Sequence, residues 1–80
     1  MKVTILNANS CEISTEKGTF LQSYNVVVAG YINGVLHLDK EYHNYSKTTS
    51  KHITQWTGLS SAERTKGIKD GSILLSDLNQ

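Results

Sequence analysis

The first half of the chain alternates hydrophobic and polar residues in the manner of β-strands. Short runs of this kind cover residues 3–6 and 11–13, and each is followed by turn-forming residues. Two longer runs, residues 20–32 and 35–42, are rich in β-branched and aromatic side chains. Asn33-Gly34 between them is the strongest short hairpin signal, because both residues tolerate the positive φ of a type I′ turn. The sequence therefore predicts a small antiparallel sheet with a central β-hairpin.

A two-residue turn fixes the register of this hairpin and sets Ile32 opposite Val35, and Val27 opposite Lys40. Alternation directs one set of side chains toward the predicted core: Val27, Ala29, Tyr31, Leu36, Leu38 and Tyr42. It directs the other set to a mixed face: Tyr24, Val26, Val28, Ile32, Val35, His37, Asp39, Glu41 and His43. We expect the mixed face to be partly solvated.

From residue 46 onward the spacing of the hydrophobic residues becomes helical. Ile53 and Trp56 are three residues apart, Gly58 can end a helix, and a serine or threonine at 46, 48 or 49 can cap its start. This pattern predicts a helix at about residues 48–57, with Trp56 anchoring it to the sheet.

A capping box predicts a second helix. Ser60 is its cap, and Glu63 occupies the third helical position. The helix should end at Asp70-Gly71. Residues 73–75 form a last apolar run that fits either a strand or a helical tail, because periodicity alone does not separate these alternatives.

The length and the order of these elements indicate one α+β domain. Eighty residues suffice for a single small core. We predict a small antiparallel β-sheet in residues 1–45, followed in residues 46–80 by two short helices packed on one face and a C-terminal tail.

Composition argues against several classes of protein. The net charge is +1, so no global basic field attracts the chain to nucleic acid or to an anionic membrane. No apolar run approaches the roughly 20 residues of a membrane span, and the apolar start is too short for a signal peptide. We expect a cytoplasmic protein whose lone Cys11 is reduced and structural.

Catalytic and metal-binding patterns are weak. His37, Asp39, Glu41 and His43 alternate along one predicted strand, where such neighbours lie about 7 Å apart and cannot all reach one ion. The chain has no Gly-x-Ser-x-Gly elbow and no Gly-Lys-Ser/Thr phosphate loop. We therefore expect no enzyme, no metal and no cofactor.

The positive charge is concentrated in residues 47–69. This segment carries one acid, Glu63, and five cations: Lys47, Lys51, Arg64, Lys66 and Lys69. Two short helices that carry these cations resemble a helix-turn-helix in outline. A nucleic-acid-binding module that uses this basic helical segment is therefore one possible function.

Two stretches of the chain carry a family resemblance. The stretches are Gly-Thr-Phe-Leu-Gln-Ser-Tyr-Asn at 18–25 and Tyr-His-Asn-Tyr-Ser-Lys-Thr-Thr-Ser-Lys at 42–51. Their Gln-Ser-Tyr and Tyr-Ser-x-Thr-Thr-x-Lys motifs resemble a group of small uncharacterised proteins of phages and mobile elements. The resemblance covers about residues 1–57 and implies a phage-type origin and action inside a bacterial cell. Small phage proteins of this build often block host defence, CRISPR systems included, by occupying a functional surface of a larger complex.

The first hypothesis for function is thus a non-enzymatic protein that inhibits or modulates a host protein complex. The mixed hairpin face and the junction at 45–51 would form the contact surface, through six side chains: Tyr24, Asp39, Glu41, His43, Tyr45 and Lys51. The nucleic-acid module is the alternative. An exposed edge strand also leaves a homodimer open.

Overall fold

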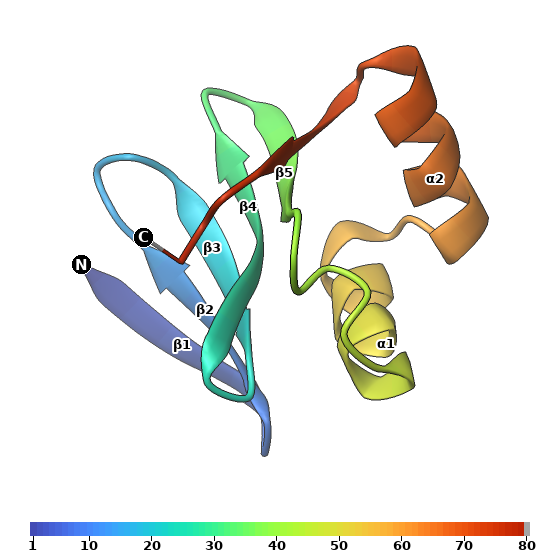
Figure 1. Ribbon diagram of the computed structural model, residues 1–80. Helices are drawn as coiled ribbons and strands as arrows, with labels where there is room; N and C mark the ends of the chain where they lie inside the picture. Colours follow the sequence, from blue (N-terminus) through green and yellow to red (C-terminus); the bar gives the residue numbers. More distant parts are fainter. Residues whose placement is uncertain (80) are drawn as a thin grey trace.

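The computed structural model describes residues 1–79 and contains a six-stranded sheet and two helices (Figure 1). The elements are β1 (Lys2–Asn7), β2 (Ser10–Ser14), β3 (Thr19–Ser23), β4 (Val26–Ile32), β5 (Val35–Asp39), α1 (Lys47–Thr57), α2 (Ser61–Asp70) and β6 (Ile73–Ser76). The strands follow one another across the sheet in chain order, and the first five are antiparallel. The predicted α+β class is confirmed.

Capping places both helices as the sequence predicts. Ser46 caps α1 and accepts a hydrogen bond from the backbone of Thr49, and Gly58 ends the helix with a left-handed φ of 76°. Ser60 and Glu63 form the predicted capping box at the start of α2. The serine caps satisfy backbone N–H groups that have no partner inside the helix, and Gly58 donates its own N–H to Thr54 O at the other end of α1.

The last apolar run is a strand, and it departs from the antiparallel pattern. β6 pairs with β5 in parallel, with Leu36 opposite Ile73. The reason is the connection: the chain leaves β5, passes through both helices on one face, and returns to run in the same direction. Parallel neighbours require such a long crossover, which residues 40–72 supply.

The hairpin register is confirmed near the turn and wrong farther away. Ile32 pairs with Val35, as predicted, but β5 ends at Asp39, so the pair of Val27 with Lys40 does not form. Beyond the hairpin, β4 has one more residue than the part of β3 that it faces, a β-bulge at Val28. The pairs on either side of it are Leu21 with Ala29 and Gln22 with Val27.

The bulge reverses the alternation of β4. Val26 and Val28 therefore pack with the core on the helix side, and Val27 lies on the side of Gln22, the reverse of the predicted arrangement. One extra residue has this effect because side chains alternate with a period of two.

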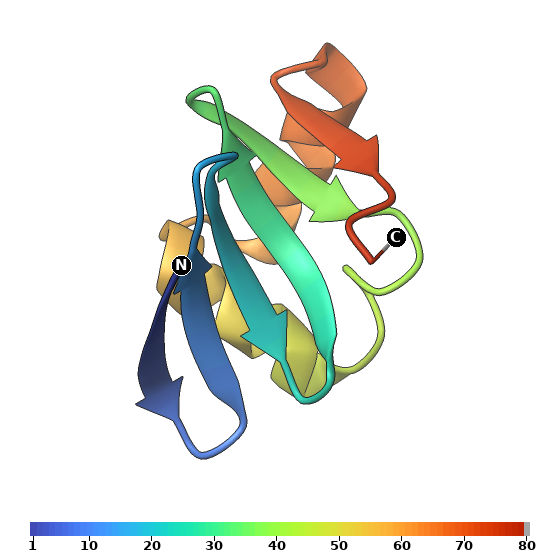
Figure 2. The ribbon, with the colours of Figure 1, turned by 90° about the vertical axis from the view of Figure 1, so that its left-hand side faces the viewer.

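Both helices cover one face of the sheet, and the core lies between these layers (Figure 1). The buried hydrophobic residues are Leu21, Val28, Ala29, Leu36, Leu38, Ile53 and Ile73. Trp56 anchors α1 as predicted: its Nε1 donates to Glu12 Oε1 at 2.8 Å, and its ring lies 5.2 Å from that of Tyr31. The opposite face of the sheet, turned toward the viewer in Figure 2, has no helix over it.

Candidate functional sites

Asp39, a predicted contact residue, is a structural residue. Its side chain is only 1% exposed and accepts four hydrogen bonds. The donors are the backbone N–H groups of Glu41, Tyr42 and Leu78 and the side-chain amide of Asn79. The C-terminal tail thus covers Asp39, and its place in the predicted contact surface is wrong because a partner cannot reach it. An aspartate that ends a strand and accepts from residues two and three positions later is an Asx-turn signal, which could have identified this role.

The other predicted contact residues lie on several different elements. Tyr24 lies in the β3–β4 turn with its ring 6.1 Å from that of His52 in α1. Glu41 lines a hollow with Lys40 and Asp77. His43 is half-buried beside Arg64. Tyr45 is 64% exposed, and Lys51 is exposed on α1.

The only arginine of the basic segment is buried. Arg64 is 5% exposed and donates to Thr54 Oγ1 at 2.7 Å, Leu59 O at 2.8 Å and Ser50 Oγ at 2.7 Å. It therefore joins α2 to α1, and its two terminal nitrogens are bonded inside the protein, which disfavours the predicted contact with a phosphate. Lys47, Lys51, Lys66 and Lys69 remain exposed.

The uncovered face of the sheet, called here the open face, carries mostly apolar side chains. Strand register places six side chains on its first half: Val3, Ile5, Cys11, Ile13, Phe20 and Gln22. Six more lie on its second half: Val27, Ile32, Val35, His37, Leu74 and Ser76. None of these is Asp, Glu, Lys or Arg. Asp39 points the same way by alternation but lies under the tail.

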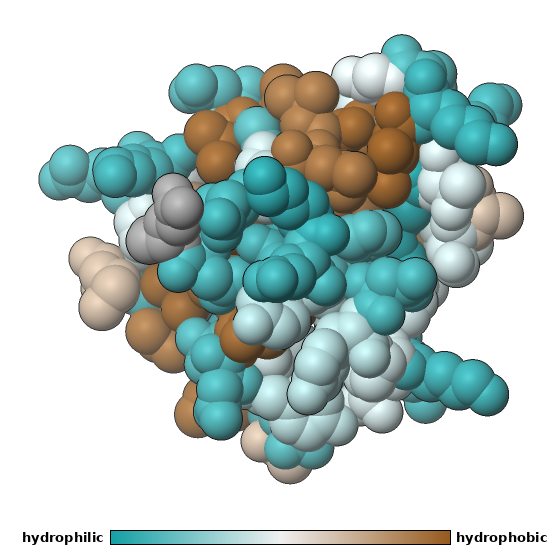
Figure 3. All heavy atoms as spheres, in the orientation of Figure 1, coloured by the Kyte–Doolittle hydropathy of each residue, from teal (hydrophilic) through white to brown (hydrophobic). Residues whose placement is uncertain are grey.

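Exposed apolar side chains extend to both ends of the open face. Ile5 of the edge strand β1 is 79% exposed, and Leu74 of β6 is 44% exposed. Figure 3 shows hydrophobic surface gathered over the end of the β4–β5 hairpin and β6, where Val35 is also exposed. In the centre, the Phe20 ring lies against Gly30, where an added Cβ would come within 2.5 Å of it. The open face is thus flat in the middle and apolar at its margins.

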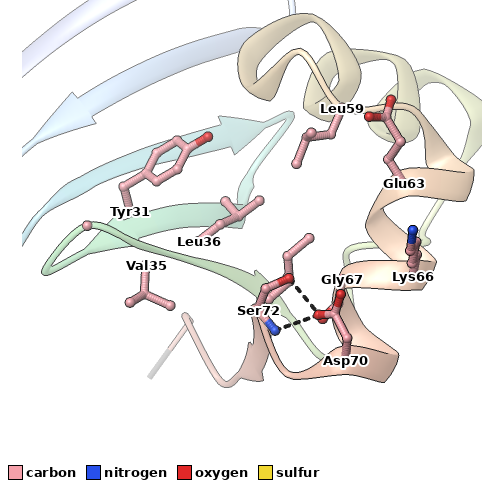
Figure 4. A pocket seen from close by; sticks show the side chains of 11 residues that line it. Tyr31, Val35, Leu36, Leu59, Glu63, Lys66, Gly67, Asp70 and Ser72 are labelled. Carbon is pink, nitrogen blue, oxygen red and sulfur yellow. Dashed lines mark hydrogen bonds between the residues drawn. The ribbon is translucent and has the colours of Figure 1, made fainter.

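A second hollow of about 540 Å³ lies between the β4–β5 hairpin and α2 (Figure 4). Its floor is apolar, with Tyr31, Leu36 and Leu59 pointing toward it. Lys66 lies on its rim with two acids of the same helix, at positions 63 and 70. Acidic neighbours reduce the positive potential that Lys66 offers to a phosphate, so this side of α2 does not favour nucleic acid.

The two sequence motifs meet in a chain of three hydroxyl groups. Ser46 Oγ donates to Thr49 Oγ1 at 3.2 Å, and Thr49 Oγ1 lies 3.3 Å from Ser23 Oγ. Ser23 Oγ lies 2.8 Å from His52 Nδ1. The donor and acceptor in the Thr49–Ser23 pair and in the Ser23–His52 pair are set by the tautomer of the His52 ring.

His52 lies in a cleft of about 230 Å³ between the β1–β2 turn and α1. The other residues that line it are Leu6, Asn7, Ser10, Gln55 and Trp56. His52 and Ser10 are each 7% exposed. Sequence analysis missed His52, although Thr49, His52, Ile53 and Trp56 follow the i, i+3, i+4, i+7 spacing of a buried helical stripe.

Comparison with known proteins places the chain in a family. Residues 1–71 match a family of unknown function, DUF8033. The chain belongs to this family. The predicted membership of an uncharacterised family is confirmed, and the DUF8033 match continues past residue 57, where the predicted resemblance ends, through α2. Neither a curated protein nor a solved structure matches the chain.

Two kinds of feature are absent from the described part of this DUF8033 chain. Neither of its helices is long and apolar enough to cross a membrane. Within residues 1–79, no three His, Cys, Asp or Glu side chains are grouped so that they could hold a metal ion.

Acid should destabilise this DUF8033 chain through its buried imidazoles. Burial lowers the pKa of His52 and His43 below the ordinary 6.5, helped by Lys51 at His52 and by Arg64 at His43, while Asp39 opposes the shift at His43. Above the pKa of the unfolded chain, both histidines are neutral in the folded and the unfolded state, so the free energy of unfolding does not depend on their protonation. As the pH falls through 6.5 toward the lowered values, the unfolded chain binds protons first, so the free energy of unfolding decreases.

Thermal unfolding from about pH 8 to about pH 5 measures this effect. We expect the Tm of the wild-type DUF8033 chain to fall across this range, and the Tm of His52→Gln to fall less steeply. If the two proteins lose Tm in parallel, His52 is not a source of the acid sensitivity.

Proposed function

We propose that this protein is a non-catalytic binding protein whose open face docks on a partner protein, and that docking inhibits or modulates a host protein complex. The observation that carries the proposal is the composition of the open face: of the thirteen side chains that strand register places there, twelve are not Asp, Glu, Lys or Arg, and the thirteenth, Asp39, lies under the tail. Depletion of charge is the compositional mark of the centre of a protein–protein interface. Contiguous exposed apolar surface on a small domain indicates an interaction site.

The edge strand β1 indicates how the partner is held. β1 is the first strand of the sheet, pairs only with β2, and is exposed over all six residues. One side of its backbone is therefore free to pair with an extended segment of another protein. Such a segment would gain main-chain hydrogen bonds from β1 and apolar contacts from Val3 and Ile5.

The same surface disfavours nucleic acid as the partner. Binding to a phosphate backbone depends on lysine and arginine, and the open face has neither. The exposed lysines of α1 and α2 lie on the opposite side of the sheet (Figure 1). The family resemblance supports a phage-type origin and action in the bacterial cytoplasm, where a defence complex such as a CRISPR effector is one target of this kind.

Ile5→Lys tests the open face. We expect at least tenfold weaker capture of the partner, because the charge enters an apolar contact next to the paired edge. Stability should change little, since the Ile5 side chain is 79% exposed. Leu75→Lys is the matched control: Leu75 is 44% exposed on the opposite edge and faces away from the open face.

The measurement is affinity capture of the three proteins from nuclease-treated bacterial lysate, followed by titration with the purified captured protein. Loss with Ile5→Lys and retention with Leu75→Lys support the proposal. Equal capture by both variants overturns it, and so does capture that disappears with nuclease. Sedimentation of the protein alone is the second readout. If the wild type is a dimer and Ile5→Lys is a monomer, the open face binds a second copy of this chain and not a foreign protein.

A further inference from the structure

We propose that the cleft around His52 is a separate binding site for a carboxylate group. It lies on the helix side of the sheet, away from the open face, and does not rest on the function proposed above. The inference starts from two polar side chains, Ser10 and His52, which are each 7% exposed and line the same cleft of about 230 Å³.

Both side chains present a hydrogen-bonding atom to the cleft. Within residues 1–79, His52 bonds through Nδ1 to Ser23, and neither His52 Nε2 nor Ser10 Oγ has a protein partner. No fully buried side-chain nitrogen or oxygen in this part of the chain lacks a partner. The two atoms therefore open toward the space in the cleft, where a ligand would satisfy them.

The proposal assigns the ring hydrogen of His52 to Nε2. In this arrangement Ser46 donates to Thr49, Thr49 to Ser23 and Ser23 to Nδ1, so that the Nε2–H group is the donor that faces the cleft. Burial also keeps the imidazole neutral near pH 7. The two sequence motifs thus act together to hold one N–H group in a fixed direction. Ser23 is a positioning residue for this site.

The remaining polar groups of the cleft are also donors. Asn7 Oδ1 accepts from the backbone of Asn9 at 3.0 Å, which leaves its amide N–H₂ free. Gln55 adds a second amide, and Ser10 adds a hydroxyl. Leu6 supplies an apolar wall, and so does Trp56, whose own N–H is bonded to Glu12.

A carboxylate fits this arrangement better than other common groups. Two oxygens accept about four hydrogen bonds and donate none. A phosphate would need lysine or arginine in the lining, and the cleft has neither. The charged and titratable groups around His52 are Lys51 on its own helix, Tyr24 from the β3–β4 turn, and Glu12, which Trp56 holds. Lys51 favours the anion.

The test is NMR titration of the ¹⁵N-labelled full chain with sodium propionate, and with propionamide as the neutral control. Propionate should shift the signals of Ser10, His52 and Gln55 saturably and raise the pKa of the His52 ring. Propionamide should do neither. An equal response to both compounds overturns the proposal.

Variants show which groups bind. We expect His52→Gln to weaken propionate binding at least tenfold, and Gln55→Ala, an exposed change that cannot disturb the core, several-fold. His37→Gln is the matched control, because His37 Nδ1 also lies 2.8 Å from a serine hydroxyl, that of Ser76, but on the open face. It should bind as the wild type does. Unchanged affinity in Gln55→Ala and His52→Gln contradicts the site.

Two further readouts complete the experiment. Ser23→Ala should change the ¹⁵N signature of the His52 tautomer and weaken binding; an unchanged tautomer would contradict the positioning role. The source of the carboxylate is tested with acetyl-Leu-Leu bearing a free C-terminus and with its amide. Tighter binding of the free acid than of propionate assigns the site to a polypeptide, and the reverse assigns it to a small acid.

Discussion

Replacing Asp39 by asparagine should lower the free energy of unfolding by about 3 kcal/mol, because the change disrupts hydrogen bonds to a buried charge. The carboxylate is 1% exposed and accepts from Glu41 N at 3.1 Å, Tyr42 N at 2.9 Å, Leu78 N at 2.8 Å and Asn79 Nδ2 at 3.1 Å. Asparagine has the same shape but only one oxygen. The N–H₂ group of the asparagine would face N–H donors that now bond to a carboxylate oxygen, and these donors would lose their acceptor.

Urea unfolding of the wild type and Asp39→Asn measures this loss. For a domain this small, about 3 kcal/mol corresponds to a Tm lower by roughly 10 °C or more. Asp77→Asn is the control, because Asp77 is exposed and accepts only a long local bond, 3.4 Å from Asn79 N. It should stay within about 0.5 kcal/mol of the wild type. A loss below about 1 kcal/mol in Asp39→Asn would show that the tail does not depend on this carboxylate.

Arg64→Lys should cost about 2 to 4 kcal/mol, although the positive charge is kept. One guanidinium nitrogen reaches Thr54 and Leu59, and the other reaches Ser50, so a planar fork joins α2 to α1 and to their linker. An ammonium has a single centre and cannot occupy both positions. At 5% exposure, solvent cannot replace the lost bonds.

Chemical denaturation with Lys69→Ala as the exposed control measures the role of Arg64. Lys69→Ala should be close to neutral. A fully stable Arg64→Lys protein would show that the guanidinium bonds are replaceable. It would also reopen a surface role for this position. The structural account predicts instead that any loss of ligand binding in Arg64 variants follows their loss of stability.

Local signals explain why much of the fold could be predicted. Asn33-Gly34 is compatible with few turns, and it determines the hairpin register as far as Ala29. Ser60 with Glu63, and Gly58, act within one helical turn of the residues they cap. These interactions join neighbours in the chain, so the sequence contains all the information they need.

The parts that could not be predicted depend on contacts between distant residues. The bulge at Val28 arises where β4 pairs with β3. Residues 73–76 form a strand because the edge of β5 offers backbone groups with which they can pair. The same apolar run, 73–75, would fit a helix if no edge were available. Packing against another element selects between such alternatives.

The chain by itself determined the order of the elements as far as residue 70, the caps of both helices and the central hairpin, because each rests on residues close in sequence. Only the tertiary structure decided which polar residues are functional candidates. It buried Asp39 and Arg64, which had looked exposed, and joined Ser23 to His52 across 29 positions. Burial and long-range hydrogen bonds are properties of the packed sheet and helices, and local patterns such as the Asx turn at Asp39 encode only a part of them.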